Sequence, residues 1–124
     1  MECAITFDGE LLLIRLGGVM QDDDLLELLR LVSEAEARTP LVPHRLTDMS
    51  GLTELHLTFV GMNERVRLRR AMAFPNAFKS AIVAPEPAQF GFARMFQTLN
   101  DHPQIEIMVF REMAAARAWV GGGG

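Results

Sequence analysis

The sequence predicts an α/β domain in which helices flank a mostly parallel sheet of about five strands. Three observations predict this fold: a strand pair joined by a tight turn at the N-terminus, apolar runs of strand length after it, and amphipathic segments between those runs. A helix between successive strands makes a crossover connection, which leaves the two strands parallel. The predicted order of elements is ββαβαβαβα.

The first two strands are predicted at 3–7 and 10–16, as a hairpin. They flank Asp8-Gly9, which is a strong signal for a two-residue turn. Gly17-Gly18 is expected to end the second strand. This strand pair is the antiparallel edge of the predicted sheet.

A first helix is predicted at 21–38. Its apolar residues repeat at helical spacing, at Leu25, Leu28, Leu29, Val32 and Ala35. Three aspartates stand at its start, where the helix dipole and unpaired amide groups favour carboxylates. We interpret these aspartates as capping residues and not as a metal site.

The remaining elements alternate between strand and helix. The segment at 79–85 is a continuous apolar run ended by a proline, which is typical of a central buried strand. Thr58 is the expected N-cap of the second helix, Pro87 takes the favoured first position of the third, and Trp119 is expected to dock the last helix against the sheet. The predicted ranges are a strand at 44–49, a helix at about 58–72, the strand at 79–85, a helix from 87 to the "DHP" at 101–103, a strand at 104–110 and a helix at 112–120.

Composition predicts one self-sufficient domain at 1–120. Apolar residues make up 49% of the 124 residues, enough for a core of this size, and the glycines at 121–124 are expected to form a disordered tail. The net charge of −4 disfavours nucleic acid and anionic membranes as partners. The longest apolar run, Leu11–Ile14, is too short to span a bilayer, and no signal peptide is visible. We therefore expect a cytoplasmic protein with no membrane span.

Ligands of open α/β sheets gather beyond the carboxyl ends of the strands, against helix N-termini. In this sequence the rule selects the loops after the second, third and fourth strands. The candidate ligand or partner site consists of Asp48, Ser50, His56, Thr58, Glu86, Gln89, Phe90 and Arg94. These residues form no catalytic triad, phosphate loop or nucleophile elbow, so the sequence predicts no enzyme, no catalytic residue and no cofactor.

Other conspicuous residues have ordinary structural interpretations. The three histidines are too scattered for a local ligand motif, so we expect no metal site. Cys3 is the single cysteine, which excludes a disulfide framework. The arginine run at 65–70 is interpreted as a solvated helix face with Glu64 as a partner, in preference to an anion or nucleic-acid site. Phe90 lies off the inner stripe of its helix and either covers a strand end or lines a pocket mouth or partner interface.

Two segments of the second half carry a family resemblance: "KSAIVAPEPAQFGFARMFQTL" at 79–99 and "IMVFREMAAARAWV" at 107–120. With the N-terminal hairpin and the alternation that follows it, they resemble the STAS superfamily, and within it the SpoIIAA-like (STAS/SEC14-like) bacterial proteins. The resemblance implies a STAS-like fold with no settled activity. Similarity to SEC14-type domains implies binding of a lipid or another hydrophobic ligand.

The segment 47–59, "TDMSGLTELHLTF", bears on regulation. Antagonists of the STAS superfamily carry a strand ending Asp-Leu-Ser and then Asp-Ser-Ser-Gly at a helix start, where a serine is phosphorylated. Asp48–Ser50 matches the first element, whereas His56 stands in place of the aspartate and Thr58 near the serine. Thr58 is therefore the one candidate phosphosite, and we favour its role as an N-cap.

Two functions of different classes remain open. The first is a non-enzymatic STAS-like regulatory or protein-interaction domain, supported by the order of elements and the lack of a catalytic constellation. The second is a binding domain for a small hydrophobic, lipid-like ligand, supported by eight methionines and eight phenylalanines. The edge strand and a phenylalanine-bearing surface also suggest a homodimer.

Overall fold

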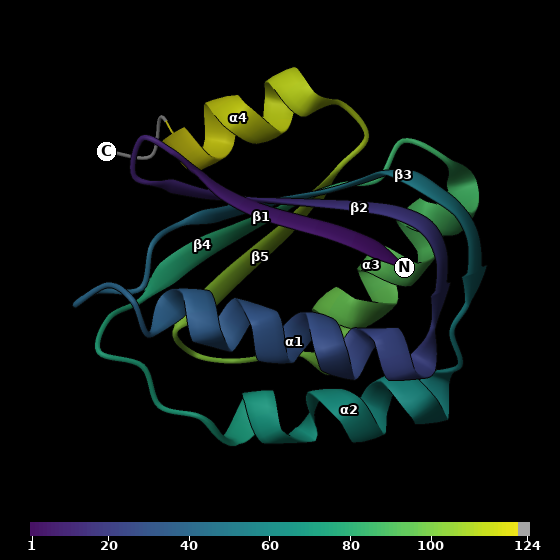
Figure 1. Ribbon diagram of the computed structural model, residues 1–124, viewed down its shortest axis with the longest axis horizontal. Helices are drawn as coiled ribbons and strands as arrows, with labels where there is room; N and C mark the ends of the chain where they lie inside the picture. Colours follow the sequence, from purple (N-terminus) through teal and green to yellow (C-terminus); the bar gives the residue numbers. More distant parts are fainter. Residues whose placement is uncertain (122–124) are drawn as a thin grey trace.

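The computed structural model describes residues 1–121 and contains one five-stranded sheet with helices on both faces (Figure 1). The strands lie in the order β1-β2-β3-β4-β5; β1 is antiparallel to β2, and the other neighbours are parallel. The predicted order ββαβαβαβα is confirmed. The elements are β1 (Glu2–Asp8), β2 (Leu11–Gln21), α1 (Asp22–Glu36), β3 (Arg45–His56), α2 (Phe59–Ala71), β4 (Phe78–Val83), α3 (Pro87–Leu99), β5 (Ile105–Phe110) and α4 (Met113–Gly121).

The last helix runs one residue further than expected. Gly121, which the sequence assigned to the tail, is the last residue of α4, and 122–124 lie outside the described residues. Trp119 packs on Phe110 of β5 with ring centroids 5.8 Å apart, so the expected docking of this helix on the sheet is confirmed. No helix in the described part of the chain is long and apolar enough to cross a membrane.

The prediction that Gly17-Gly18 ends the second strand is wrong. β2 continues to Gln21, and its pairing with β3 shifts register twice, between Arg15 and Gly17 and between Gly18 and Val19. Gly18 has a φ of +80°, which glycine adopts without steric cost. The glycine pair therefore bends the strand and does not stop it.

β3 is correspondingly longer than the predicted 44–49. It runs to His56 because the extension of β2 pairs with it, from Gly17 opposite Gly51 to Gln21 opposite His56. The backbones approach closely here, since a Cβ on Gly51 would lie 2.6 Å from the carbonyl oxygen of Leu16. Most of the loop predicted after the third strand is thus strand.

The helices cover the two faces unequally, as Figure 1 shows. α4 packs alone on β3, β4 and β5, on one face. On the other face, α1 contacts the sheet mainly at β2 and β1, and α3 contacts it mainly at β5 and β3. The main contacts of α2 are with α1 and α3, so α2 bridges these two helices above the middle of the sheet.

Hydrogen bonds fix the start of α2 to the start of α1. Thr58 is the N-cap of α2, as predicted, and its hydroxyl oxygen accepts a hydrogen bond from the Gly61 backbone N–H at 2.9 Å. Asp22, at the start of α1, accepts hydrogen bonds from the Thr58 backbone N–H at 3.0 Å and from the Thr58 hydroxyl at 2.9 Å. One aspartate therefore holds the N-terminal ends of both helices together.

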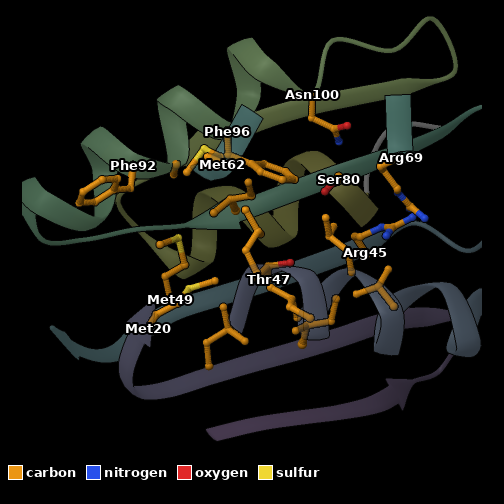
Figure 2. Close-up of a pocket in the computed structure, with 18 of the residues that line it drawn as sticks. Met20, Arg45, Thr47, Met49, Met62, Arg69, Ser80, Phe92, Phe96 and Asn100 are labelled. Carbon is orange, nitrogen blue, oxygen red and sulfur yellow. The ribbon is translucent and has the colours of Figure 1, made fainter. Parts of the chain in front are cut away.

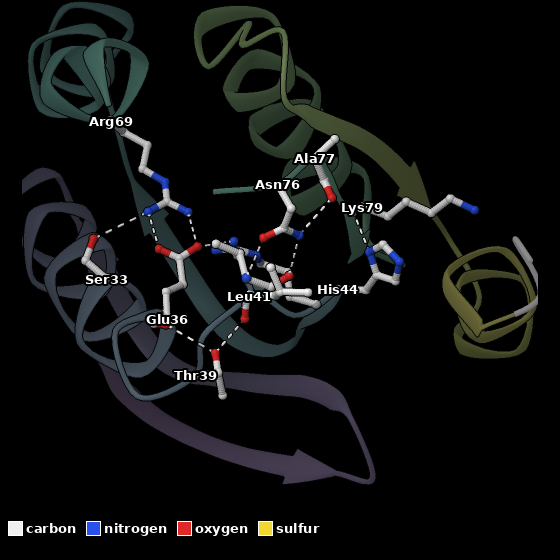
Figure 3. A network of polar contacts seen from close by, with 11 residues as sticks. Ser33, Glu36, Thr39, Leu41, His44, Arg69, Asn76, Ala77 and Lys79 are labelled. Carbon is white, nitrogen blue, oxygen red and sulfur yellow. Dashed lines mark hydrogen bonds and ion pairs between the residues drawn. The ribbon is translucent and has the colours of Figure 1, made fainter. Parts of the chain in front are cut away.

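A buried ion cluster joins the other ends of these helices to the sheet (Figure 3). Glu36, the last residue of α1, accepts hydrogen bonds from Arg69 of α2 on both carboxylate oxygens, each at 2.6 Å, and from Arg45 of β3 on one of them. The three residues are only 4–7% exposed. The interpretation of the arginine run as a solvated face is therefore wrong for Arg69, whose partner is the distant Glu36 and not the adjacent Glu64.

The loops beside this cluster are tied by side chains to the backbone. The Asn76 amide bonds to Val42 in both directions, accepting from its N–H at 2.7 Å and donating to its carbonyl at 3.0 Å. His44 Nδ1 accepts from the Lys79 backbone N–H at 2.8 Å, as Figure 3 shows. These contacts fix the segments that enter β3 and β4.

We predict that Glu36→Gln lowers the free energy of unfolding by about 3–5 kcal/mol, because it leaves two buried guanidinium groups without a compensating charge. Glu34→Gln is the matched control: Glu34 is on the same helix and pairs with an arginine at 2.5 Å, but that pair is half exposed. Its loss should cost about 0.5 kcal/mol or less. Urea denaturation followed by circular dichroism measures both, and equal losses would contradict the structural role of Glu36.

The same carboxylate should make stability depend on acid. Burial by itself raises the pKa of Glu36, but the hydrogen bonds and charges of Arg69 and Arg45 outweigh it and hold that pKa below its ordinary value of 4.5. The resulting stabilisation is present above the unfolded-state pKa and is lost as the pH falls through the folded-state pKa.

The free-energy gap between wild type and Glu36→Gln should therefore be largest near neutral pH and should shrink between about pH 5 and about pH 3. Urea denaturation of both proteins across that range measures the gap. A gap that stays constant or widens toward acid would contradict the assignment.

Candidate functional site

A cavity of about 80 Å³ lies between the sheet and the three helices on its larger face. β2, β3, β4 and β5 form its floor, α1 and α3 form its walls, and α2 forms its roof. Its lining is predominantly apolar, as is usual for sites that bind small molecules. The lining residues are Ile14, Leu16, Met20, Leu25, Leu28, Leu29, Val32, Arg45, Thr47, Met49, Leu57, Met62, Arg69, Ser80, Ile82, Phe92, Ala93, Phe96, Asn100 and Ile105.

Strand alternation explains which residues form the floor. Successive side chains of a strand point to opposite faces, so Arg45, Thr47 and Met49 of β3 all face the cavity, whereas Leu46 packs under α4. The parallel register places Arg45 opposite Ser80 of β4, which also lines the cavity. The polar floor is therefore built by two central strands side by side.

The cavity has an apolar end and a polar end, which Figure 2 shows on opposite sides. Met20, Met49 and Phe92 lie at the apolar end. The polar groups gather at the other end, where β3 begins and where α2 and α3 finish: Arg45, Arg69, Ser80 and Asn100. The arrangement suits a molecule with a polar head and an apolar body.

Arg45 is the least satisfied charge at the polar end. Burial lowers the pKa of its guanidinium to about 10 and the positive charge of Arg69 acts in the same direction, whereas Glu36 opposes the shift. The group therefore stays charged at neutral pH. Its Nε has no hydrogen-bond partner among the described residues, and the same is true of the Asn100 side-chain oxygen.

The polar side chains of the cavity lining are suited to binding through hydrogen bonds and charge. Arginine, asparagine, serine and threonine side chains supply its polar atoms, and none of the residues described as lining it is a histidine, a cysteine or a carboxylate. Ser80 therefore has no general base beside it in this lining. Among the residues that the structure describes, no group of three His, Cys, Asp or Glu could hold a metal ion.

Of the residues predicted around the end of the third strand, Asp48 and Ser50 lie within β3, His56 is its last residue and Thr58 follows it. Asp48 accepts a hydrogen bond from the Ser50 backbone N–H at 2.9 Å. His56 pairs with Glu54 at 3.0 Å, and both side chains are exposed. Thr58 caps α2. These contacts of Asp48 and His56 lie within β3, and that of Thr58 lies at the start of α2.

Two of the four residues predicted around the third helix, Glu86 and Gln89, belong to its N-terminal cap. The Gln89 side chain accepts from the Glu86 backbone N–H at 3.1 Å and donates to the Leu52 carbonyl at 2.9 Å. Phe90 is half buried under the Arg111 guanidinium, 4.2 Å from its ring centroid. Arg94 is exposed on α3.

None of the eight predicted site residues lines the cavity described above. The strand-end rule pointed to the carboxyl ends of β3 and β4, whereas the polar end of the cavity lies at the opposite end of these strands. A sequence signal for it did exist: Arg45 and Ser80 each occupy an inward position in a predicted strand, where a polar residue is unusual. Phe92 and Phe96 of α3 both line the cavity.

A comparison with solved structures supports the fold. No family model matches the chain, and no curated protein matches it. A solved structure that resembles it is an uncharacterised protein from Shewanella loihica PV-4, of the DUF3478 family and with a SpoIIAA-like fold. The two are 18% identical and superpose with a TM-score of 0.58, over 96% of this chain and 92% of that one. The protein, with its five-stranded mixed sheet and four helices among the described residues, has a SpoIIAA-like fold.

Proposed function

We propose that the protein is a non-enzymatic binding domain that takes a small, largely apolar molecule into the cavity under α2. The observation that carries this proposal is the cavity itself, which lies in the main core and is lined predominantly by apolar side chains. Protein interiors pack closely, and voids larger than a water molecule are few in one domain. A void of this size therefore supports a binding role.

The lining is also adaptable. Met20, Met49 and Met62 surround the space, and methionine fills irregular gaps because its unbranched side chain has several rotatable bonds. Phe92 and Phe96 on the α3 wall remain partly accessible to solvent. Flexible side chains and an accessible wall support the entry of a ligand without rearrangement of the sheet.

A regulatory or protein-interaction role is the second candidate, and the outer surface of α2 favours it. Val60 and Leu68 are 64% and 75% exposed, although they belong to a helix whose inner face is also apolar. Exposed apolar residues gathered on one element are typical of contact surfaces. Because α2 is the roof of the cavity, the two roles would share one helix.

We predict that 1-hexanol, which has seven non-hydrogen atoms, binds the wild-type protein with a dissociation constant of about 1 mM, the affinity of a small ligand of ordinary efficiency. Ala93→Leu should abolish this binding, because Ala93 lines the cavity from α3 and a larger side chain would fill the space. Two-dimensional NMR of isotope-labelled protein measures both, with shifts expected at methyl groups of the lining residues.

Ala88→Leu is the control for the alanine replacement. Ala88 lies on the same helix but is exposed and does not line the cavity, so this variant should bind 1-hexanol as the wild type does. Circular dichroism establishes that both variants fold. Shifts that are scattered over the surface, or that persist in Ala93→Leu, would count against the cavity as the binding site.

A further inference from the structure

We propose that the ligand of the cavity is a short-chain carboxylate, whose alkyl chain lies among the methionines and Phe92 and whose head group pairs with Arg45. This inference rests on the proposed function and adds the chemical class of the ligand. It follows from three features of the polar end: an excess of buried positive charge, unpaired hydrogen-bonding groups, and the limited size of the space.

The ion cluster contains two guanidinium groups but one carboxylate. Arg69 takes both oxygens of Glu36 in a bidentate pair, at 2.6 Å each, and also donates to the Ser33 hydroxyl at 3.4 Å. Arg45 donates to only one of these oxygens, which also accepts a hydrogen bond from Arg69. A net charge of +1 is thus left on groups that are almost fully buried, and it belongs chiefly to Arg45.

Other groups near Arg45 offset this charge only in part. Its guanidinium lies 4.5 Å from the centroid of the Phe78 ring, a favourable cation–π position. The C-terminal ends of α1 and α2, which carry partial negative charge, are close to the cluster. Neither feature gives Arg45 Nε a hydrogen-bond acceptor, and that atom remains unpaired among the described residues.

Arg45 belongs to the cavity lining, and its unpaired Nε is buried. A guanidinium presents its N–H groups in a planar fork that matches a carboxylate, and a monoanion equals the excess charge. Ser80 adds a hydroxyl at the same end. The unpaired Asn100 oxygen needs a donor, which a water molecule bound beside the carboxylate supplies.

The space limits the ligand to a short chain. A cavity volume of 80 Å³ accommodates on the order of five to eight water-sized groups, if each needs about 10–15 Å³. Hexanoate has eight non-hydrogen atoms and is therefore near the upper limit. Its carboxylate at the Arg45 end would place its methyl end toward Met20, Met49 and Phe92, the apolar end that Figure 2 shows.

Three six-carbon probes of different charge test the proposal on the wild-type protein at neutral pH: hexanoate, 1-hexanol and hexylamine. Hexanoate should bind about tenfold or more tightly than 1-hexanol, as expected for one charge-assisted pair, and hexylamine should bind weakest. NMR titration of the lining methyl groups gives the three dissociation constants. If 1-hexanol binds as tightly as hexanoate, the carboxylate assignment is overturned while the cavity-binding function stands. If no probe binds, both fail.

The Arg45→Met variant tests whether Arg45 is the residue that makes hexanoate bind more tightly than 1-hexanol. The replacement leaves Glu36 and Arg69 as a neutral bidentate pair, so 1-hexanol should still bind while hexanoate loses its advantage of about tenfold. Arg15→Met is the matched control, since Arg15 is exposed on the neighbouring strand and does not line the cavity. Hexanoate that binds Arg45→Met as it binds the wild type would overturn the proposal. If Arg45→Met does not fold, the comparison of the three probes on the wild type decides.

Discussion

The architecture around the cavity depends on one carboxylate shared by two arginines. Glu36 ends α1, Arg69 lies in the last turn of α2 and Arg45 opens β3, so their contact joins two helices and the central strand at a single point. Charges buried this deeply are stable only when each is paired with good geometry. The requirement therefore constrains where α1 and α2 finish relative to the sheet, more strictly than apolar packing alone would.

This constraint explains how a cavity persists in a core of ordinary apolar residues. α2 is fixed at its start, where Asp22 bonds to the Thr58 cap, and near its end, where Arg69 bonds to Glu36. Between these points it rests on α1 and α3 and not chiefly on the sheet. A helix held at both ends cannot sink toward the strands to close the space beneath it, so the polar contacts maintain the void that the lining residues leave.

Local patterns in the sequence predicted the elements, and long-range contacts decided what the sequence could not predict. The hairpin turn, the Thr58 cap and Pro87 at the start of α3 depend on neighbouring residues, and all three are present. The length of β3 depends on pairing with the part of β2 that follows Gly17-Gly18, and the sequence predicted that these glycines end the strand. The burial of Arg69 depends on Glu36, which is 33 positions away. Helical periodicity relates residues three or four positions apart and cannot indicate a partner 33 positions away. The arginine run was therefore interpreted as solvated.

The placement of the site follows from the same physics. Ligands of open α/β sheets usually bind at the carboxyl ends of the strands because helix N-termini there offer unpaired amides. Here Thr58 and the Glu86–Gln89 pair occupy the starts of α2 and α3 and use those amides for capping. At the opposite end Glu36 cannot fully satisfy two guanidinium groups. The amide groups at the carboxyl ends of the strands are thus paired within the protein. The buried positive charge that lacks a full partner lies at the other end, where the strands begin.

A carboxylate bound to Arg45 would leave Glu36 free to pair with Arg69 alone, which would tighten the attachment of α2. If the ligand is the carboxylate proposed above, occupation of the cavity and the position of its roof helix are therefore coupled through Glu36.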